Sequence, residues 1–121
     1  MKIIIIGASG TIGTHVTKAL KQDHELTTVG LNTGDYKTDI RNVAAILSLF
    51  EKIGNFDALV STTGSGHFAP LSTLNDSNFR IGIDNKLMGQ INLVLEGQHF
   101  INPRGSFTLS SGIVFDDPVP Q

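Results

Sequence analysis

Short apolar runs and amphipathic segments alternate along this chain. The first run, Lys2–Ile6, contains four consecutive isoleucines, and such a β-branched run is typical of a strand buried on both faces of a parallel sheet. Four further segments have the pattern of strands: Glu25–Gly30, Tyr36–Thr38, Asp57–Ser61 and Ser106–Ser110. Between them, apolar residues at helical spacing predict helices over residues 12–21, 43–53 and 77–100. Strands that alternate with helices predict a doubly wound α/β fold.

Local signals place the ends of the helices and the buried face of the last one. Asp39 stands where it can cap the second helix, and Gly54 ends that helix. Asn75 or Asp76 can cap the third helix. The buried face of the third helix is expected to contain Ile83, Leu87, Ile91 and Val94. Residues 102–105, Asn-Pro-Arg-Gly, predict a turn before the last strand.

A glycine-rich turn joins the first strand to the first helix. Gly7 permits a sharp turn, Gly10 lets the backbone approach a pyrophosphate, and Gly13 lets the helix pack closely on the strand. The free N–H groups and the positive dipole end of the helix then face the anion. The alternative is a tight turn that needs small residues and binds no ligand. The strand before the turn and the helix after it favour a nucleotide-binding site.

The end of the second strand bears on the choice of cofactor. A dinucleotide fold that selects NAD places an acidic residue there, which binds the ribose 2′-hydroxyl. This chain has Gly-Leu-Asn-Thr at residues 30–33, without a carboxylate. Nothing there repels a 2′-phosphate, and Asn32, Thr33 or Lys37 could donate to it. No arginine stands at this position either, so the sequence favours NADP only slightly and NAD stays possible.

Composition limits the remaining classes of function. With 121 residues, the chain is expected to form one domain over residues 1–121. A formal net charge of −2 without a long charge run gives no sign of a nucleic-acid partner or an anionic membrane surface. The absence of cysteine excludes a disulfide framework and a thiolate zinc site, and it fits a reducing cytosol. No stretch is long enough to span a bilayer, so the protein is expected to be cytoplasmic.

Four blocks of the sequence together resemble the short-chain dehydrogenase/reductase family over essentially the whole chain. Residues 7–13 are similar to its glycine loop, and Asp39-Ile40 to the pair that contacts adenine. Residues 57–64 match its fourth strand in spacing, although Ser-Thr-Thr replaces Asn-Asn-Ala. Residues 105–111 match its fifth strand, whose final serine is catalytic and corresponds to Ser111. The resemblance implies a three-layer Rossmann-type sheet with strand order 3-2-1-4-5.

The resemblance also implies a set of site residues. Cofactor contacts are expected from Gly7, Ser9, Gly10, Thr11, Ile12, Gly13, Leu31, Asn32, Asp39, Ile40, Thr62, Thr63 and Gly64. Catalytic candidates are Ser111 and either Asn85 or Lys86, because Lys86 stands three residues before Gly89, where the family has asparagine. No metal site is expected. The family's Tyr-x-x-x-Lys motif would lie beyond Gln121, and the only tyrosine is Tyr36. The chain is therefore expected to be the front portion of a dehydrogenase-like protein, without the family's last helices and strands.

Two functions remain open. In the first, the protein is an NAD(P)-dependent oxidoreductase for a small carbonyl or alcohol substrate, and Ser111 polarises the carbonyl. Residues 63–65 would then line the nicotinamide ribose, with His67 or Phe68 bordering the substrate. In the second, it is a sensor or regulatory module that binds NAD(P) without turnover, as Thr63 in place of alanine, the displaced asparagine and the missing tyrosine suggest. An open edge at the last strand predicts a homo-oligomer.

Overall fold

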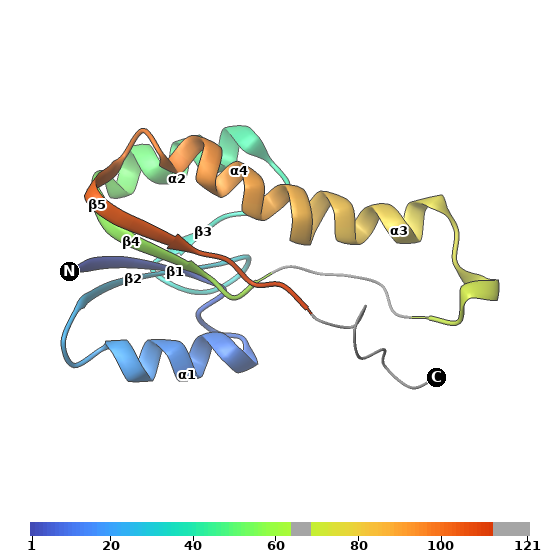
Figure 1. Ribbon diagram of the computed structural model, residues 1–121, viewed down its shortest axis with the longest axis horizontal. Coiled ribbons are helices and arrows are strands. Elements are labelled where there is room, and N and C mark those ends of the chain that lie inside the picture. The colour runs from blue at the N-terminus through green and yellow to red at the C-terminus, as the bar shows by residue number, and fades with distance from the viewer. Residues whose placement is uncertain (64–68, 113–121) are drawn as a thin grey trace.

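The computed structural model describes residues 1–63 and 69–112 and shows a parallel sheet between two layers of helices (Figure 1). The strands are β1 (Lys2–Ile6), β2 (Glu25–Gly30), β3 (Tyr36–Lys37), β4 (Phe56–Ser61) and β5 (Ile101–Thr108). Their order in the sheet is β3-β2-β1-β4-β5, and each neighbouring pair is parallel. This confirms the expected Rossmann-type architecture and strand order.

The helices divide between the two faces of the sheet. On one face lies α1 (Thr11–Leu20), and on the other lie α2 (Val43–Ile53) and a long helical segment (Figure 1). That segment consists of α3 (Asp76–Gly82), a π-helical turn η2 (Ile83–Leu87) and α4 (Met88–Gly97). A short 3₁₀ turn, η1 (Leu71–Thr73), precedes it. In the described ranges, none of the helices has the length and apolar character that crossing a bilayer requires.

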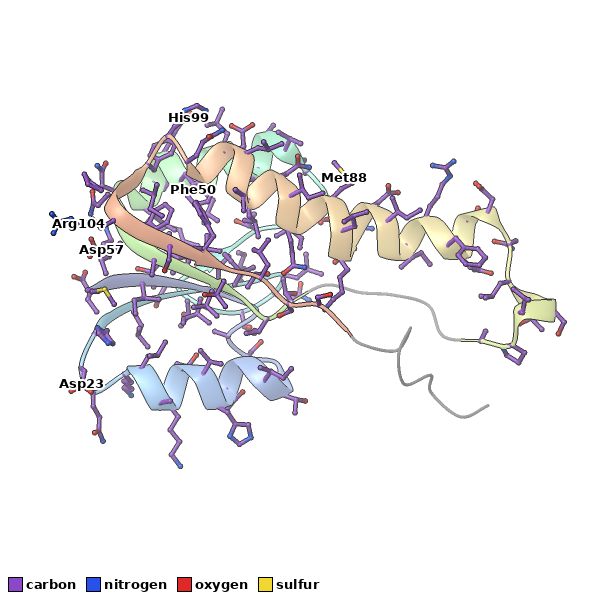
Figure 2. The ribbon with its side chains drawn as sticks, in the orientation of Figure 1. Asp23, Phe50, Asp57, Met88, His99 and Arg104 are labelled. Atoms are coloured by element: carbon purple, nitrogen blue, oxygen red, sulfur yellow. The ribbon has the colours of Figure 1, made fainter. Side chains whose placement is uncertain are left out.

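Alternation along the central strands divides the core into two clusters. Ile4 and Ile6 point toward α2 and α4, where Phe50 is fully buried and stacks on Phe56 with ring centroids 5.5 Å apart (Figure 2). Ile3 and Ile5 point to the other face, where α1 covers them. Burial on both faces explains the uninterrupted isoleucine run, since a strand with one solvated face would alternate with polar residues.

The buried face of the α3–η2–α4 segment differs from the one expected for the third helix. Ile83, Leu87 and Ile91 are exposed, and Val94 is only partly buried. The residues that face the sheet are Gly89, Gln90, Leu93 and Gly97. A Cβ added to Gly97 would lie 3.0 Å from the rings of both Phe50 and Phe107. The helix therefore packs through its small residues, because they allow it to approach the sheet closely, and its larger apolar side chains remain outside.

Two local expectations also need correction. Asp39 does not cap α2, because Asn42 is the N-cap and its side chain accepts a hydrogen bond from the N–H of Ala45. The turn expected at residues 102–105 lies inside β5, which begins five residues earlier than expected, at Ile101. There the pairing with β4 shifts register, and Arg104 has a φ of 67°. The turn is thus a bulge that β5 absorbs without ending.

Candidate dinucleotide-binding site

The three glycines of the β1–α1 turn have different structural roles. Gly7 has a φ of 83°, and a Cβ there would lie 2.8 Å from the Cβ of Thr63. A Cβ on Gly13 would lie 1.9 Å from the carbonyl oxygen of Gly7. Gly10 has only that same oxygen nearby, at 3.4 Å. Gly7 and Gly13 are therefore required by the fold itself, whereas Gly10 leaves space above the turn.

The N-terminus of α1 opens onto this space. Its N-cap is Gly10, which is extended and has no side chain to satisfy the first N–H groups of the helix. These N–H groups have no intrahelical partner, and they lie at the positive end of the helix dipole. The carbonyl of Gly10 accepts hydrogen bonds from both the backbone N–H and the hydroxyl of Thr14, at 2.9 and 2.7 Å. The arrangement is rigid and suits an anion.

Two adjoining cavities form a groove over the carboxyl ends of the central strands. One has a volume of about 370 Å³ and the other about 400 Å³. They share Gly7, Gly30, Leu31 and Thr63 in their walls. Ligands of open parallel sheets bind at this edge, where the strand order reverses direction. Here the reversal is between β1 and β4, because the chain passes from β3 at one side to β4 at the other.

The larger cavity ends at a polar pair formed by Ser9 and Thr33. The hydroxyl of Thr33 donates to the hydroxyl oxygen of Ser9 at 3.0 Å, which ties the end of β2 to the glycine turn. Asn32 lines the same cavity. Thr62 anchors the opposite wall, since its hydroxyl is 3.1 Å from the carbonyl oxygens of both Ile6 and Gly7. This end of the groove is therefore hydroxyl-rich and contains no carboxylate among its lining residues.

The smaller cavity is bordered by an acidic and a basic side chain. Asp39 and Arg41 line it beside Ile40 and Ile81. The guanidinium of Arg41 binds the carboxylate of Asp39, with Nη2 at 2.7 Å from Oδ2. Side-chain and backbone hydrogen bonds from Arg41 hold the pKa of Asp39 below its usual value. The carboxylate therefore remains ionised at neutral pH and can only accept hydrogen bonds.

The catalytic candidates lie at the same edge of the sheet, near η2 and the end of β5. Asn85 lines the smaller cavity, and Lys86 follows it in η2. Buried Gln90 joins the two segments: its Nε2 donates to the carbonyls of Lys86 and Ser110, at 3.0 and 2.9 Å, and its Oε1 accepts from the N–H of Ser110. Ser111, the next residue, is exposed. One amide side chain thus holds the strand end that carries Ser111 against η2.

Most of the expected cofactor residues lie around the groove. Those that line one or both cavities are Gly7, Ser9, Gly10, Leu31, Asn32, Asp39, Ile40, Thr62 and Thr63. Thr11, Ile12 and Gly13 form the first turn of α1. Gly64, Ser65, His67 and Phe68 lie outside the described residues. Sequence reasoning overlooked Arg41 and Gln90, although Arg41 is only two positions from Asp39 and could have been read as its partner.

No family model matches the chain, but solved structures do. The protein lin1944 from Listeria innocua is similar with a TM-score of 0.95 and 47% identity, over 98% of this chain and 59% of that one. A small-chain dehydrogenase has a TM-score of 0.87 and 26% identity, over 98% and 57% of the two chains. A small-chain dehydrogenase in complex with NADPH has a TM-score of 0.88 and 24% identity, over 98% and 54%.

Among curated proteins, an oxidoreductase named aprR, from Aspergillus flavus, is 26% identical over 92 residues. These are 69% of this chain and 31% of that protein. The chain thus spans 59% or less of the length of each of these four proteins. The two solved dehydrogenase structures confirm the resemblance to short-chain dehydrogenases/reductases that the sequence indicates.

Proposed function

We propose that this chain, which has the fold of the short-chain dehydrogenases/reductases, binds NADP(H) along the groove over β1, β2 and β4. In this proposal it is the cofactor-binding portion of an oxidoreductase that acts on a small carbonyl or alcohol. The observation that carries the proposal is the open space above Gly10, which lies at an uncapped helix N-terminus in the wall of the larger cavity. A dinucleotide offers a doubly anionic pyrophosphate to such a space.

The residues present fit such a cofactor. The pyrophosphate would lie over Gly7–Thr11, where N–H groups of α1 replace its hydration shell. The adenine would enter the cavity beside Asp39 and Ile40, whose apolar walls match a flat base. The neighbour crystallised with NADPH supports this type of ligand.

The end of β2 supports NADP(H) over NAD(H). The hydroxyls of Ser9 and Thr33 and the amide of Asn32 gather where an NAD-selective site would have a carboxylate. The hydroxyl of Ser9 and the amide of Asn32 can donate hydrogen bonds to a 2′-phosphate, whereas a carboxylate would repel it. The Thr33 hydroxyl already donates to Ser9. The preference for NADP(H) thus rests on the absence of a carboxylate among the residues that line the larger cavity.

Chemistry would take place near η2 and the end of β5, where the catalytic candidates lie. The bound nicotinamide would supply or accept the hydride. Ser111 would donate its hydroxyl hydrogen bond to the substrate carbonyl oxygen, and Asn85 or Lys86 would contribute from η2. The hydroxyl of Ser110 donates instead to the carbonyl of Ser61, at 2.6 Å. Of the two serines, Ser111 is therefore the one we assign to the substrate.

A titration with NADPH and NADH tests the proposal on wild type and on Gly10→Val. The added side chain enters the phosphate space, and we expect NADPH affinity to fall at least tenfold, about 1.4 kcal/mol. A thermal melt checks that the variant is folded. Equal NADPH binding by both proteins would contradict the site.

The same titration tests the choice of cofactor through Leu31→Asp. A carboxylate at the end of β2 is expected to move the preference toward NADH. If wild type already binds NADH tenfold tighter than NADPH, the assignment of NADP(H) is wrong, while the site over the glycine turn stands.

A further inference from the structure

The pairing between β4 and β5 ends before the chain reaches Ser111. In the described register the last residue of β5 opposite β4 is Thr108, which pairs with Val60. Each residue that follows still has a backbone N–H and a carbonyl that need partners. A strand end without such partners opens easily, because few contacts hold it. The position of Ser111 therefore depends on contacts other than those of the sheet.

The side-chain amide of Gln90 supplies this pairing at Ser110. Its Oε1 accepts from the Ser110 N–H at 2.8 Å, and its Nε2 donates to the Ser110 carbonyl at 2.9 Å. A neighbouring antiparallel strand would offer the same two bonds to a single residue. The hydroxyl of Ser110 donates to the carbonyl of Ser61 at 2.6 Å. All three polar groups of Ser110 are thus bonded, so the backbone enters Ser111 from a fixed position.

The same amide is attached to the π-helical turn η2. Nε2 of Gln90 also donates to the carbonyl of Lys86, at 3.0 Å. Turns of this kind inside helices are rare, and they occur frequently at functional sites. η2 also contains Asn85, which lines the smaller cavity. A single amide group therefore connects the strand end that precedes Ser111 with the turn that contains the other two catalytic candidates.

The chemistry of the side chain at position 90 is specific to this arrangement. Gln90 is only 6% exposed, and a buried amide is costly unless it is hydrogen-bonded. Its two N–H groups and its oxygen are all used here. An apolar side chain of the same length could make none of the three bonds. An ionised glutamate would retain the acceptor but would direct a carboxylate at two carbonyl oxygens.

We propose that Gln90 is a positioning residue: its amide continues the pairing of β5 by one residue and so keeps the Ser111 hydroxyl beside η2, where it can donate to a substrate carbonyl. The inference rests on the proposed function, which assigns Ser111 to the substrate. Ser111 itself is exposed, so burial of its own side chain does not fix it. Without the amide, the N–H and the carbonyl of Ser110 would turn to water, and Ser111 would move away from η2.

A spin label at position 111 tests this directly. The chain contains no cysteine, so Ser111→Cys provides a single labelling site. The mobility of the label is measured by electron paramagnetic resonance with Gln90 intact and in Gln90→Met and Gln90→Glu. Both substitutions are expected to increase the rotational rate of the label at least threefold. The control is Gln98→Met, which removes an exposed amide that bonds only to the Leu95 carbonyl of its own helix, and it should leave the rate unchanged.

Two further measurements separate a local effect from a general loosening of the fold. A label at Lys52→Cys, on the exposed side of α2, should keep the same mobility in every variant. Hydrogen exchange of the unlabelled chains is followed by nuclear magnetic resonance at the N–H of Ser110 and at that of buried Leu59 in β4. In Gln90→Met the exchange rate of Ser110 should rise at least tenfold more than that of Leu59, which reports global unfolding.

The outcomes distinguish this inference from the proposed function. If the label at position 111 is equally mobile with and without Gln90, or if Gln98→Met mobilises it as much, the inference is overturned. It is also overturned if the labels at positions 111 and 52 loosen together, because Gln90 would then support the whole fold. A titration of wild type with NADPH accompanies these measurements. If NADPH binds but the label does not respond to Gln90, the inference alone fails, whereas absence of binding contradicts the proposed function and the positioning role with it.

Discussion

Replacing Gly13 with alanine should destabilise the fold even though alanine is the better helix former. The new Cβ would lie 1.9 Å from the oxygen, 2.8 Å from the carbonyl carbon of Gly7 and 2.9 Å from the Cα of Ala8. All three are backbone atoms, so no side-chain rotation can relieve the contact. The same carbonyl oxygen accepts hydrogen bonds from the N–H of Gly10 and the hydroxyl of Thr62, each at 3.1 Å. Moving it disturbs the whole turn.

Two opposing effects determine whether Gly13→Ala stabilises or destabilises the fold. Glycine to alanine inside a helix normally gains about 1 kcal/mol. Overpacking costs about 1–3 kcal/mol, and a contact this short against backbone belongs at the upper end. The net effect of Gly13→Ala is therefore a loss of about 2 kcal/mol, which lowers the melting temperature of a domain of this size by roughly 10 °C.

Gly10→Ser is the matched control for this prediction. Gly10 is extended, with φ −75° and ψ 177°, and its nearest neighbour for a Cβ is at an ordinary 3.4 Å. Serine is also a better N-cap than glycine, by a few tenths of a kcal/mol. The melting curve of Gly10→Ser, followed by circular dichroism, should match that of wild type. If Gly13→Ala melts with wild type, or Gly10→Ser melts as low as Gly13→Ala, the division of roles between these glycines is wrong.

Two further predictions concern acid sensitivity and association. The backbone N–H of Lys2, followed by the Asn102 amide, keeps the pKa of Asp57 below its usual value. Its contribution is therefore present above the unfolded pKa of about 3.9 and lost as pH falls through the lower folded-state pKa. Asp57→Asn should lose less melting temperature in that acid range than wild type, and an equal loss would contradict this. Separately, the exposed apolar side chains of Phe79, Ile83 and Leu87 predict self-association of this chain. Light scattering that shows a monomeric mass would contradict it.

The buried first strand and the glycine turn could be predicted because each depends on residues close in sequence, whereas the strand order followed from the resemblance to a family. Four consecutive isoleucines require cover on both faces, and the structure gives them α1 on one side and α2 and α4 on the other. Gly7, Gly10 and Gly13 act within one turn of backbone, so their spacing alone specifies the geometry. In both cases local pattern and global fold agree.

The buried face of the segment formed by η2 and α4 could not be predicted, because it depends on how closely the segment approaches the sheet. The row Ile83, Leu87 and Ile91 is more apolar than the buried face, and a rule based on hydrophobicity selects it. Gly89 and Gly97 are buried instead, since a larger residue at Gly89 would meet Ile40 within 2.6 Å. Close approach of the helix to the sheet therefore determines which face is buried. The spacing of apolar residues along one helix does not show how close that approach is.

The roles of the charged and amide side chains of the site could not be predicted from the sequence either. Asp39 has two possible uses in the sequence: as a helix cap or as an acceptor in a binding site. Both place it at the start of α2, so spacing cannot distinguish them. The structure assigns the cap to Asn42 and pairs Asp39 with Arg41, which leaves Asp39 at the cavity instead of at the helix end. The role of Gln90 was equally hidden in the sequence. An amide side chain on a helix is usually solvated, and the partner of Gln90, Ser110, is twenty residues away. What decides the role of each side chain is which backbone group the fold brings within 3 Å of it. The chemistry at the edges of this groove therefore depends on how β5 packs against α4. The sequence shows which residue types are present there, but it does not show this packing.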